Sequence, residues 1–170
     1  MAKEIRFRRI SPTQYVVEVE DARTGVVSSL PDVGFGVSQI LPALIQLQLM
    51  APQSTLLMEQ PEIHLHPTLQ TALTDVLISA TDTKRQVIAE THSELLLSRL
   101  QRRIAERKIA LESVAILYVE MTPEGSVARE LRLDEFGNFI DQLPTGFFSE
   151  EYTERLEQAK SVALRQRPAS

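Results

Sequence analysis

Two groups of polar residues, each at the end of an apolar run, carry the side chains best suited to chemistry in this sequence. The first group is Glu59 and Gln60, and the second is Glu90, Thr91 and His92. A carboxylate such as Glu59 can hold a magnesium ion, and an amide such as Gln60 can orient an attacking water without accepting its proton. A histidine such as His92 can donate a hydrogen bond to a phosphate. These types predict a nucleotide-phosphate site with a bound cation, while each alone also fits a polar strand end or a helix start.

A metal site is a second interpretation of the same region. Glu62, His64, His66 and His92 supply one carboxylate and three imidazoles, which suit zinc or manganese. Such a cluster would make the chain a metal-dependent hydrolase or nuclease. Prolines flank the His-x-His pair on both sides, so the pair is predicted to lie in a loop and not on a strand.

The predicted elements place the first two groups at the carboxyl ends of neighbouring strands. Buried strands are expected at 56–58, 86–90 and 114–119, alternating with helices at 37–50, 67–80 and 94–107. This alternation is typical of an α/β fold with a mainly parallel sheet and helices on its faces. Ligands of such sheets bind beyond the carboxyl ends of the strands.

The segments before and after this central region have different predicted structures. Three runs joined by turns predict an N-terminal antiparallel β segment, followed by a glycine-bearing loop at 32–36 and then the first helix, with Pro42 in about its first turn. Beyond residue 120 the sequence predicts an edge strand at 127–133, a loop at 137–148 and an amphipathic helix at 150–164.

Composition bounds the class of protein. With 170 residues, 43% apolar and 24% charged, the chain is long enough for one domain with a real core. It has no cysteine, no apolar run near the roughly 18 residues of a membrane span, and no apolar stretch behind its charged N-terminus. A cytoplasmic location and no membrane association are therefore expected. The net charge of −5 argues against a nucleic-acid clamp over the whole surface. Two basic clusters, near the start and at 99–108, fit solvated faces, with a contact to nucleic acid as the alternative.

Three segments in order resemble the second half of an ABC-type ATPase head. They are the loop Val33-Gly34-Phe35-Gly36-Val37-Ser38-Gln39 before a helix, the segment LLMEQPEIHLHP, and ETHS. The likeness is strongest to the OLD-like AAA ATPases of prokaryotes, whose Walker B typically reads acid-acid-Pro-Glu followed by His-Leu-His-Pro. The tail, from LYVE through DQLPTGFF, resembles a C-terminal domain of unknown function attached to a subset of them. The resemblance spans about residues 31–152 and implies part of a P-loop NTPase sheet.

The resemblance assigns roles to the strand-end residues. It implies that Glu59 is the Walker B acid on Mg²⁺, that Gln60 stands in the place of the catalytic glutamate, and that His92 senses the γ-phosphate of ATP. The segment from Glu62 to Pro67 would be the D-loop at a dimer interface. Because an amide replaces the usual acid at Gln60, fast hydrolysis is in doubt.

The loop before the first helix would be the signature loop. Its backbone amides at a helix N-terminus would cap the γ-phosphate of ATP bound by the opposing subunit. The loop departs from the usual Ser-Gly-Gly-Gln form, and Gly36 and Ser38 are the residues expected to meet phosphate, with Gly34 and Gln39 beside them.

A P-loop is absent from the sequence. The motif G-x-x-x-x-G-K-[ST] cradles the phosphates in such enzymes, and the glycines here, at 25, 34, 36, 125, 137 and 146, do not form it. Residues 1–122 are therefore expected to be the C-terminal lobe of an ATPase head and residues 123–170 a C-terminal extension. The chain would need a missing lobe or a partner for ATP binding, as a homo-oligomer or with a P-loop-bearing ATPase.

The resemblance also raises a nuclease hypothesis, because OLD-like proteins carry a Toprim nuclease after the ATPase. That site needs a strand-end glutamate, for which Glu120 could serve, and a later Asp-x-Asp pair. Asp134-Glu135 lacks this spacing, so nuclease activity within the chain is not favoured. A DNA-related or phage-defence role of the parent protein rests on family analogy alone.

Overall fold

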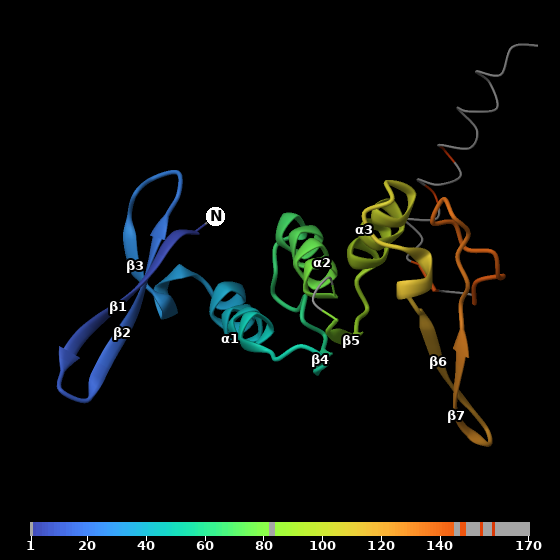
Figure 1. The fold of residues 1–170 in the computed structure, drawn as a ribbon, viewed down its shortest axis with the longest axis horizontal. Helices are drawn as coiled ribbons and strands as arrows, with labels where there is room; N and C mark the ends of the chain where they lie inside the picture. Colours follow the sequence, from blue (N-terminus) through green and yellow to red (C-terminus); the bar gives the residue numbers. More distant parts are fainter. Residues whose placement is uncertain (1, 82–83, 145–146, 149–153, 155–157, 159–170) are drawn as a thin grey trace, which may run out of the picture. The chain divides into compact units, whose positions relative to one another are not determined.

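The fold consists of two compact units, Met1–Arg99 and Leu100–Ser170. The structure is a computed structural model that describes residues 2–81, 84–144, 147–148, 154 and 158. Figure 1 follows the chain through its helices and strands. No helix among these described residues is long and apolar enough to cross a bilayer.

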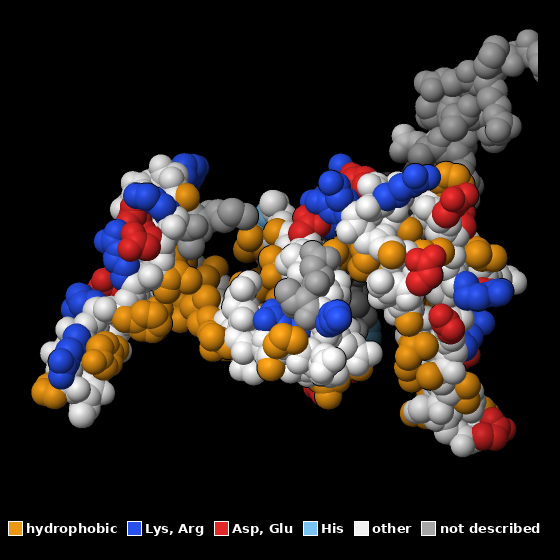
Figure 2. Space-filling model, in the orientation of Figure 1, with side chains coloured by type: hydrophobic (Ala, Val, Ile, Leu, Met, Phe, Trp, Pro, Cys, Tyr) orange, Lys and Arg blue, Asp and Glu red, His pale blue; other side chains and the backbone are white. Residues whose placement is uncertain are grey.

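An antiparallel sheet opens the first unit, as predicted. Its strands are β1 (Ala2–Ser11), β2 (Gln14–Asp21) and β3 (Val27–Ser29), in the order β1-β2-β3. Alternation along β1 and β2 separates an apolar face, with Phe7 opposite Val17, from a charged face on which Arg8 pairs with Glu18. Lysines and arginines therefore lie beside acidic side chains along this hairpin (Figure 2), so much of the N-terminal basic cluster is paired within the sheet.

The central α/β region follows in the same unit. A short 3-10 turn (Leu30–Val33) leads into α1 (Phe35–Leu49), and then come β4 (Thr55–Glu59), α2 (Pro67–Thr81) and β5 (Gln86–Glu90). Strands β4 and β5 pair in parallel with α2 as their crossover. Leu47 and Met50 at the end of α1 pack with Ala80 of α2 on one face of this pair. The predicted strands at 56–58 and 86–90 and the helices at 37–50 and 67–80 are confirmed, within a few residues at their ends.

Within the part of the chain that the structure describes, the other face of the β4–β5 pair stays exposed, whereas buried strands were predicted. Leu57 and Ile88 lie opposite each other in the register and are 71% and 51% exposed. Their neighbours along each strand point to the opposite face and contact the core, which explains the alternating burial. An apolar pair at the centre of a parallel sheet is expected to be covered.

Pro42 lies deeper in its helix than predicted. Because α1 begins at Phe35, Pro42 falls in its interior and not in the first turn. A proline there has no N–H to donate to the carbonyl four residues earlier, so the helical ladder lacks one bond. The prediction placed the helix start at Val37 and so put the proline too near its beginning.

Helix α3 (Glu94–Ala105) leads into the second unit, which contains an antiparallel hairpin of β6 (Leu117–Thr122) and β7 (Gly125–Glu130). The strand predicted at 114–119 therefore belongs to this hairpin, and the prediction that it extends the parallel sheet was wrong. A tight turn after Thr122 lets β7 pair at once with β6, which a parallel crossover would not allow. The strand predicted at 127–133 corresponds to β7 and the Leu133–Phe139 bridge beyond it.

Packing in the second unit centres on Leu131, which is fully buried, and on contacts between the rings of Tyr118, Phe139 and Phe147. Arg102 and Arg103 both pair with Glu106, so part of the basic stripe on α3 is neutralised within the helix. The C-terminal helix predicted at 150–164 falls almost entirely outside the described residues.

Candidate functional site

The parallel register brings the two predicted strand ends together. Glu59 lies directly opposite Glu90, and the backbone amide of Gln60 donates to the backbone carbonyl of Glu90 over 2.8 Å. The chain thus leaves both strands at the same edge of the sheet, with Gln60 following one strand and Thr91 and His92 following the other.

Two carboxylates share the exposed face at this edge. Glu59 and Glu90 are cross-strand neighbours and both are exposed. Like charges in this position destabilise a sheet unless a cation lies between them. Oxygen ligands of this kind suit Mg²⁺, which is bound by one or two carboxylates together with waters and substrate phosphates.

A groove of about 710 Å³ runs along the β4 side of the site. Its walls are residues of α1, including Gln39 and Gln46, and the length of β4 with Glu59, Gln60 and Glu90 at one end. Gln60 has a left-handed backbone with φ of 43°, a conformation that costs free energy in a residue other than glycine. The carboxylate and amide side chains thus border a space that could admit a ligand or another chain segment.

The predicted signature loop forms the start of α1. Gly34 is the N-cap residue, with φ of 108° and no side-chain hydrogen bond to the helix. Ser38 lies one turn further, where its amide donates to the carbonyl of Gly34 over 3.4 Å. Gln39 follows on the exposed surface. The N-cap residue therefore leaves the first-turn amides of α1 without a side-chain acceptor, and amides at a helix N-terminus favour an anion.

Gly36 holds this helix start against the loop that follows β4. A Cβ atom at Gly36 would lie 2.4 Å from the carbonyl oxygen of His64, closer than two such atoms can approach. The glycine therefore permits direct backbone packing between α1 and the predicted D-loop segment. His64 itself has φ of 63°, which bends the loop toward the helix.

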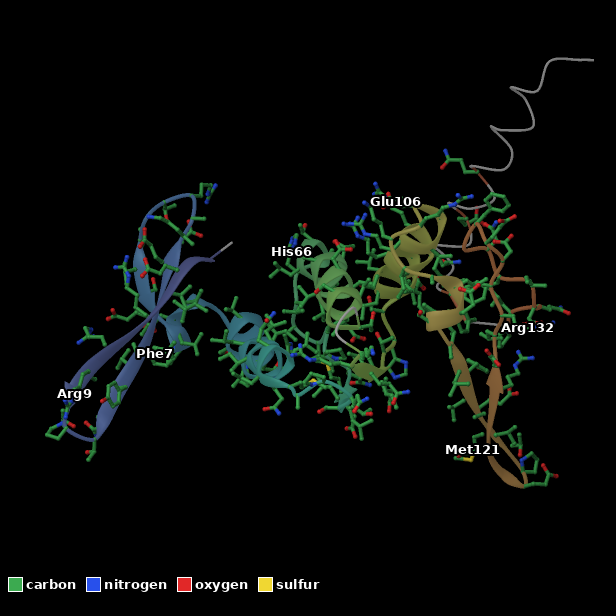
Figure 3. All side chains as sticks on the ribbon, in the orientation of Figure 1. Phe7, Arg9, His66, Glu106, Met121 and Arg132 are labelled. Atoms are coloured by element: carbon green, nitrogen blue, oxygen red, sulfur yellow. The ribbon has the colours of Figure 1, made fainter. Side chains whose placement is uncertain are left out.

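The structure contradicts the metal hypothesis for Glu62, His64, His66 and His92. Among the described residues, no group of three or more His, Cys, Asp or Glu side chains is placed to hold a metal ion. Instead, the carboxylate of Glu62 accepts hydrogen bonds from Thr91 and the backbone of His92. His66, labelled beside α2 in Figure 3, caps this helix, with its Nδ1 accepting from the amide of Thr68. The side chains of Glu62 and His66 thus hold the local backbone, and the four residues do not form a metal-holding group.

The structure also shows where the acidic residues of the nuclease hypothesis lie. Glu120 is exposed in the middle of the hairpin, on the side of β6 that also carries the half-buried Tyr118 and Thr122. Asp134 accepts hydrogen bonds from the amides of Phe136 and Asn138 and so stabilises a turn. These bonds lower the pKa of Asp134, the side chain and amide of Asn138 contributing most.

Sequence reasoning missed the contacts by which polar side chains hold these loops in place, although Ser93 or Thr91 was predicted to cap the helix from residue 94. Thr91, Ser93 and Gln70 link the segments after β4 and β5. The sequence carried one signal for them: Ser93 precedes the helix from Glu94 and is a favoured N-cap residue, and its Oγ accepts from the amide of Leu96.

The described strands and helices form a mixed α/β fold with one parallel strand pair and two antiparallel sheets. Among solved structures, the chain is similar to one from work on the "ATP-driven dimerization and DNA stimulated activation of SMC ATPases". The two share 16% sequence identity with a TM-score of 0.54, and the match covers 99% of this chain and 86% of that chain. At this identity the likeness concerns the fold, and the predicted α/β class is confirmed.

The chain belongs to the family described as "AAA domain, putative AbiEii toxin, Type IV TA system", which matches residues 8–98. This match covers more than half of the sequence and includes both strand ends and the start of α1. The family match thereby confirms the predicted relation to ABC-type P-loop ATPases at the level of the family. A comparison with curated proteins gave no match.

Proposed function

We propose that this chain is the C-terminal lobe of an ABC-type AAA ATPase head, which supplies the catalytic and signature residues of an ATP site. The observation that carries this proposal is the parallel pairing of β4 with β5, which brings Glu59, Gln60 and the His92 segment to one edge. Membership of the AAA-domain family supports ATP as the nucleotide. The phosphate cradle must come from a P-loop outside this sequence.

Each strand-end residue has a role in this proposal. Bound Mg²⁺ and ATP would supply the charge and the phosphoryl group, with Glu59 and its neighbour Glu90 facing the cation. Gln60 orients a water by hydrogen bonding, and His92 donates to the γ-phosphate. The exposed position of Glu59 and His92 at the sheet edge leaves both side chains accessible to a ligand.

The start of α1 serves as the signature side of the site. The first-turn amides between Gly34 and Ser38 face an anion most favourably, because the helix dipole adds to their own polarity. Gly36 and Ser38 would contact the γ-phosphate held by a second subunit, with Gln39 beside them. Dimerization driven by ATP is described for the SMC ATPases that share this fold, and we infer the same kind of assembly here.

The finer assignments belong to this proposal as well. We infer that residues 1–122 form the ATPase lobe and residues 123–170 a C-terminal extension, as in the OLD-like branch that the segments EQPEIHLHP and ETHS resemble. A DNA-related or defence role of the complete protein is the associated hypothesis, since the family description names a putative toxin of a toxin–antitoxin system.

The test is ATP hydrolysis by the chain mixed with its P-loop-bearing lobe or subunit. The mixture should hydrolyse ATP, while neither component does so alone and Glu59→Gln in this chain abolishes the rate. Glu120→Gln, an exposed acid on the second unit, is the matched control and should leave the rate unchanged. A mixture in which Glu59→Gln hydrolyses ATP as fast as the unchanged chain would refute the proposal.

A further inference from the structure

Glu62 is a buried acid whose carboxylate reaches across to the strand end that carries His92. It is 7% exposed. Its Oε1 accepts a hydrogen bond from the hydroxyl of Thr91 over 2.6 Å and a second from the backbone amide of His92 over 3.0 Å. Both bonds go to Oε1, while Oε2 is buried with no hydrogen-bond partner among the described residues. The two donors at Oε1 therefore fix where this carboxylate lies.

Further hydrogen bonds close the contact into a ring. The Thr91 hydroxyl accepts from the amide of Ser93 over 3.0 Å, and the Ser93 hydroxyl donates to the side chain of Gln70 over 2.7 Å. Gln70 donates to the carbonyl of Leu65 over 3.0 Å, and the amide of Leu65 donates to the carbonyl of Glu62. The loop after β4, the start of α2 and the loop after β5 are thus one hydrogen-bonded unit.

The ring holds the backbone of His92 but leaves its side chain exposed. The residue is exposed, while Glu62 on one side and Ser93 on the other are buried. The same loop also contacts α1, because His64 packs against Gly36. The loop that Glu62 anchors therefore contacts both the start of α1 and the backbone of His92.

We propose that Glu62 is a positioning residue, which sets the backbone of His92 so that the imidazole is presented to the nucleotide. The importance of this positioning for function rests on the function proposed above. The hydrogen bonds from Thr91 and His92 to Glu62 are observed independently of that function. Glu62 does not touch the reacting groups in this account; it acts through His92.

Two substitutions separate the hydrogen bonds from the space that the side chain fills. Glu62→Met keeps a side chain of similar length but removes the acceptor, and Glu62→Gln retains an oxygen that can still accept. The measurement is amide hydrogen exchange of the full chain by NMR, without nucleotide. The backbone amides of Gln53 and Gln86, which donate to the carbonyls of Lys84 and Ser54 near the beginnings of β4 and β5, serve as internal references.

The expected result is local and graded. Glu62→Met should speed exchange at the His92 amide about tenfold or more, because a hydrogen bond to a charged acceptor is lost, while the two references stay unchanged. Glu62→Gln should restore most of the protection. The ring resonances of His92 should move in Glu62→Met, and those of His66 should not.

Unchanged exchange at His92 in Glu62→Met would overturn the proposal, and so would an equal loss at the reference amides, which indicates a purely structural role. If Glu62→Met does not fold, the variant Thr91→Val tests the proposal instead. It should speed amide exchange at both His92 and Ser93, and unchanged exchange at either residue would overturn the proposal. Because no nucleotide is present, a failure here is distinct from a failure of the ATPase proposal, which the hydrolysis assay detects.

Discussion

At the scale of single residues, Gln60 has the largest consequence for the proposed chemistry. It follows Glu59 at the strand end, where a general base would stand in a faster enzyme, and its amide cannot take a proton. Gln60→Glu in the completed enzyme should therefore raise kcat for ATP by about a hundredfold or more. Steady-state hydrolysis at saturating Mg-ATP measures this, and a rate equal to or below that of the unchanged enzyme would contradict the role given to Gln60.

A second prediction at this scale concerns Asp141 and Arg132 in the second unit. The Arg132 side chain donates to Asp141 over 2.7 Å, as does its backbone amide, and together they lower the pKa of Asp141 to about 2. A lowered pKa means that the contribution to stability is complete above the ordinary pKa of about 3.8 and is lost as the pH falls toward 2.

The carboxyl resonance of Asp141, followed by NMR against pH, should titrate near 2 in the unchanged chain. In Arg132→Ala the pKa should rise toward the ordinary value without reaching it, because the backbone amide of residue 132 still donates. The same pKa in both chains would show that the ion pair does not form in solution.

At the scale of elements, the packing of α1 on the loop after β4 depends on one glycine. The Gly36→Ala substitution puts a methyl group 2.4 Å from the His64 carbonyl oxygen. This oxygen belongs to the backbone, which cannot move away as the end of a flexible side chain could. The free energy of unfolding should fall by about 1–3 kcal/mol, as for an overpacked core. Urea unfolding measures this, and Gln39→Ala, exposed in the next turn of the helix, should change it by less than about 0.5 kcal/mol.

If Gly36→Ala and Gln39→Ala were equally stable, the helix start would not touch the loop. The link between the signature side and the predicted D-loop would then be lost, although the strand-end geometry of β4 and β5 would stand.

How far the elements could be predicted depends on how local their signals are. The turns between β1, β2 and β3 and the proline at the start of α2 are local signals, and these elements are confirmed. The parallel pairing of β4 with β5 followed from two apolar runs separated by a helix. Pairing of the strand from Leu117 with β7 instead depended on the turn at 123–124, which its apolar pattern did not reveal.

The candidate site shows the same difference between features that local sequence signals predict and contacts that only the folded structure reveals. Strand-end placement of Glu59 and His92 could be predicted because it needs only strand boundaries and a parallel sheet. The bond of Glu62 to Thr91 could not, since it joins residues 29 positions apart through the rotamers of two side chains. One acid and three imidazoles suggested metal binding, whereas the side chains of Glu62 and His66 instead accept from nearby backbone amides.

At the scale of the whole molecule, the proposal of a second, P-loop-bearing lobe can be tested at the exposed apolar side chains of β4 and β5, which such a lobe would cover. Leu57→Thr should change the unfolding free energy of the isolated chain by less than about 0.5 kcal/mol, because Leu57 is 71% exposed. Leu47→Ala, at a residue 2% exposed, should cost about 2–5 kcal/mol. The same Leu57→Thr change should weaken association with the P-loop-bearing lobe, which can be measured by analytical ultracentrifugation.

An effect of Leu57→Thr on the isolated chain as large as that of Leu47→Ala would show that the face is covered within this chain. Unaltered association with the other lobe would place the contact elsewhere.

The division of one ATP site between this chain and a separate phosphate cradle is tested most directly by calorimetric titration with Mg-ATP. The chain alone should bind Mg-ATP no more tightly than about 1 mM, since it has no P-loop amides or lysine for the phosphates. Addition of the P-loop-bearing lobe should bring binding into the micromolar range, and Glu59→Gln should weaken it. Micromolar binding of Mg-ATP by the chain alone would contradict the account.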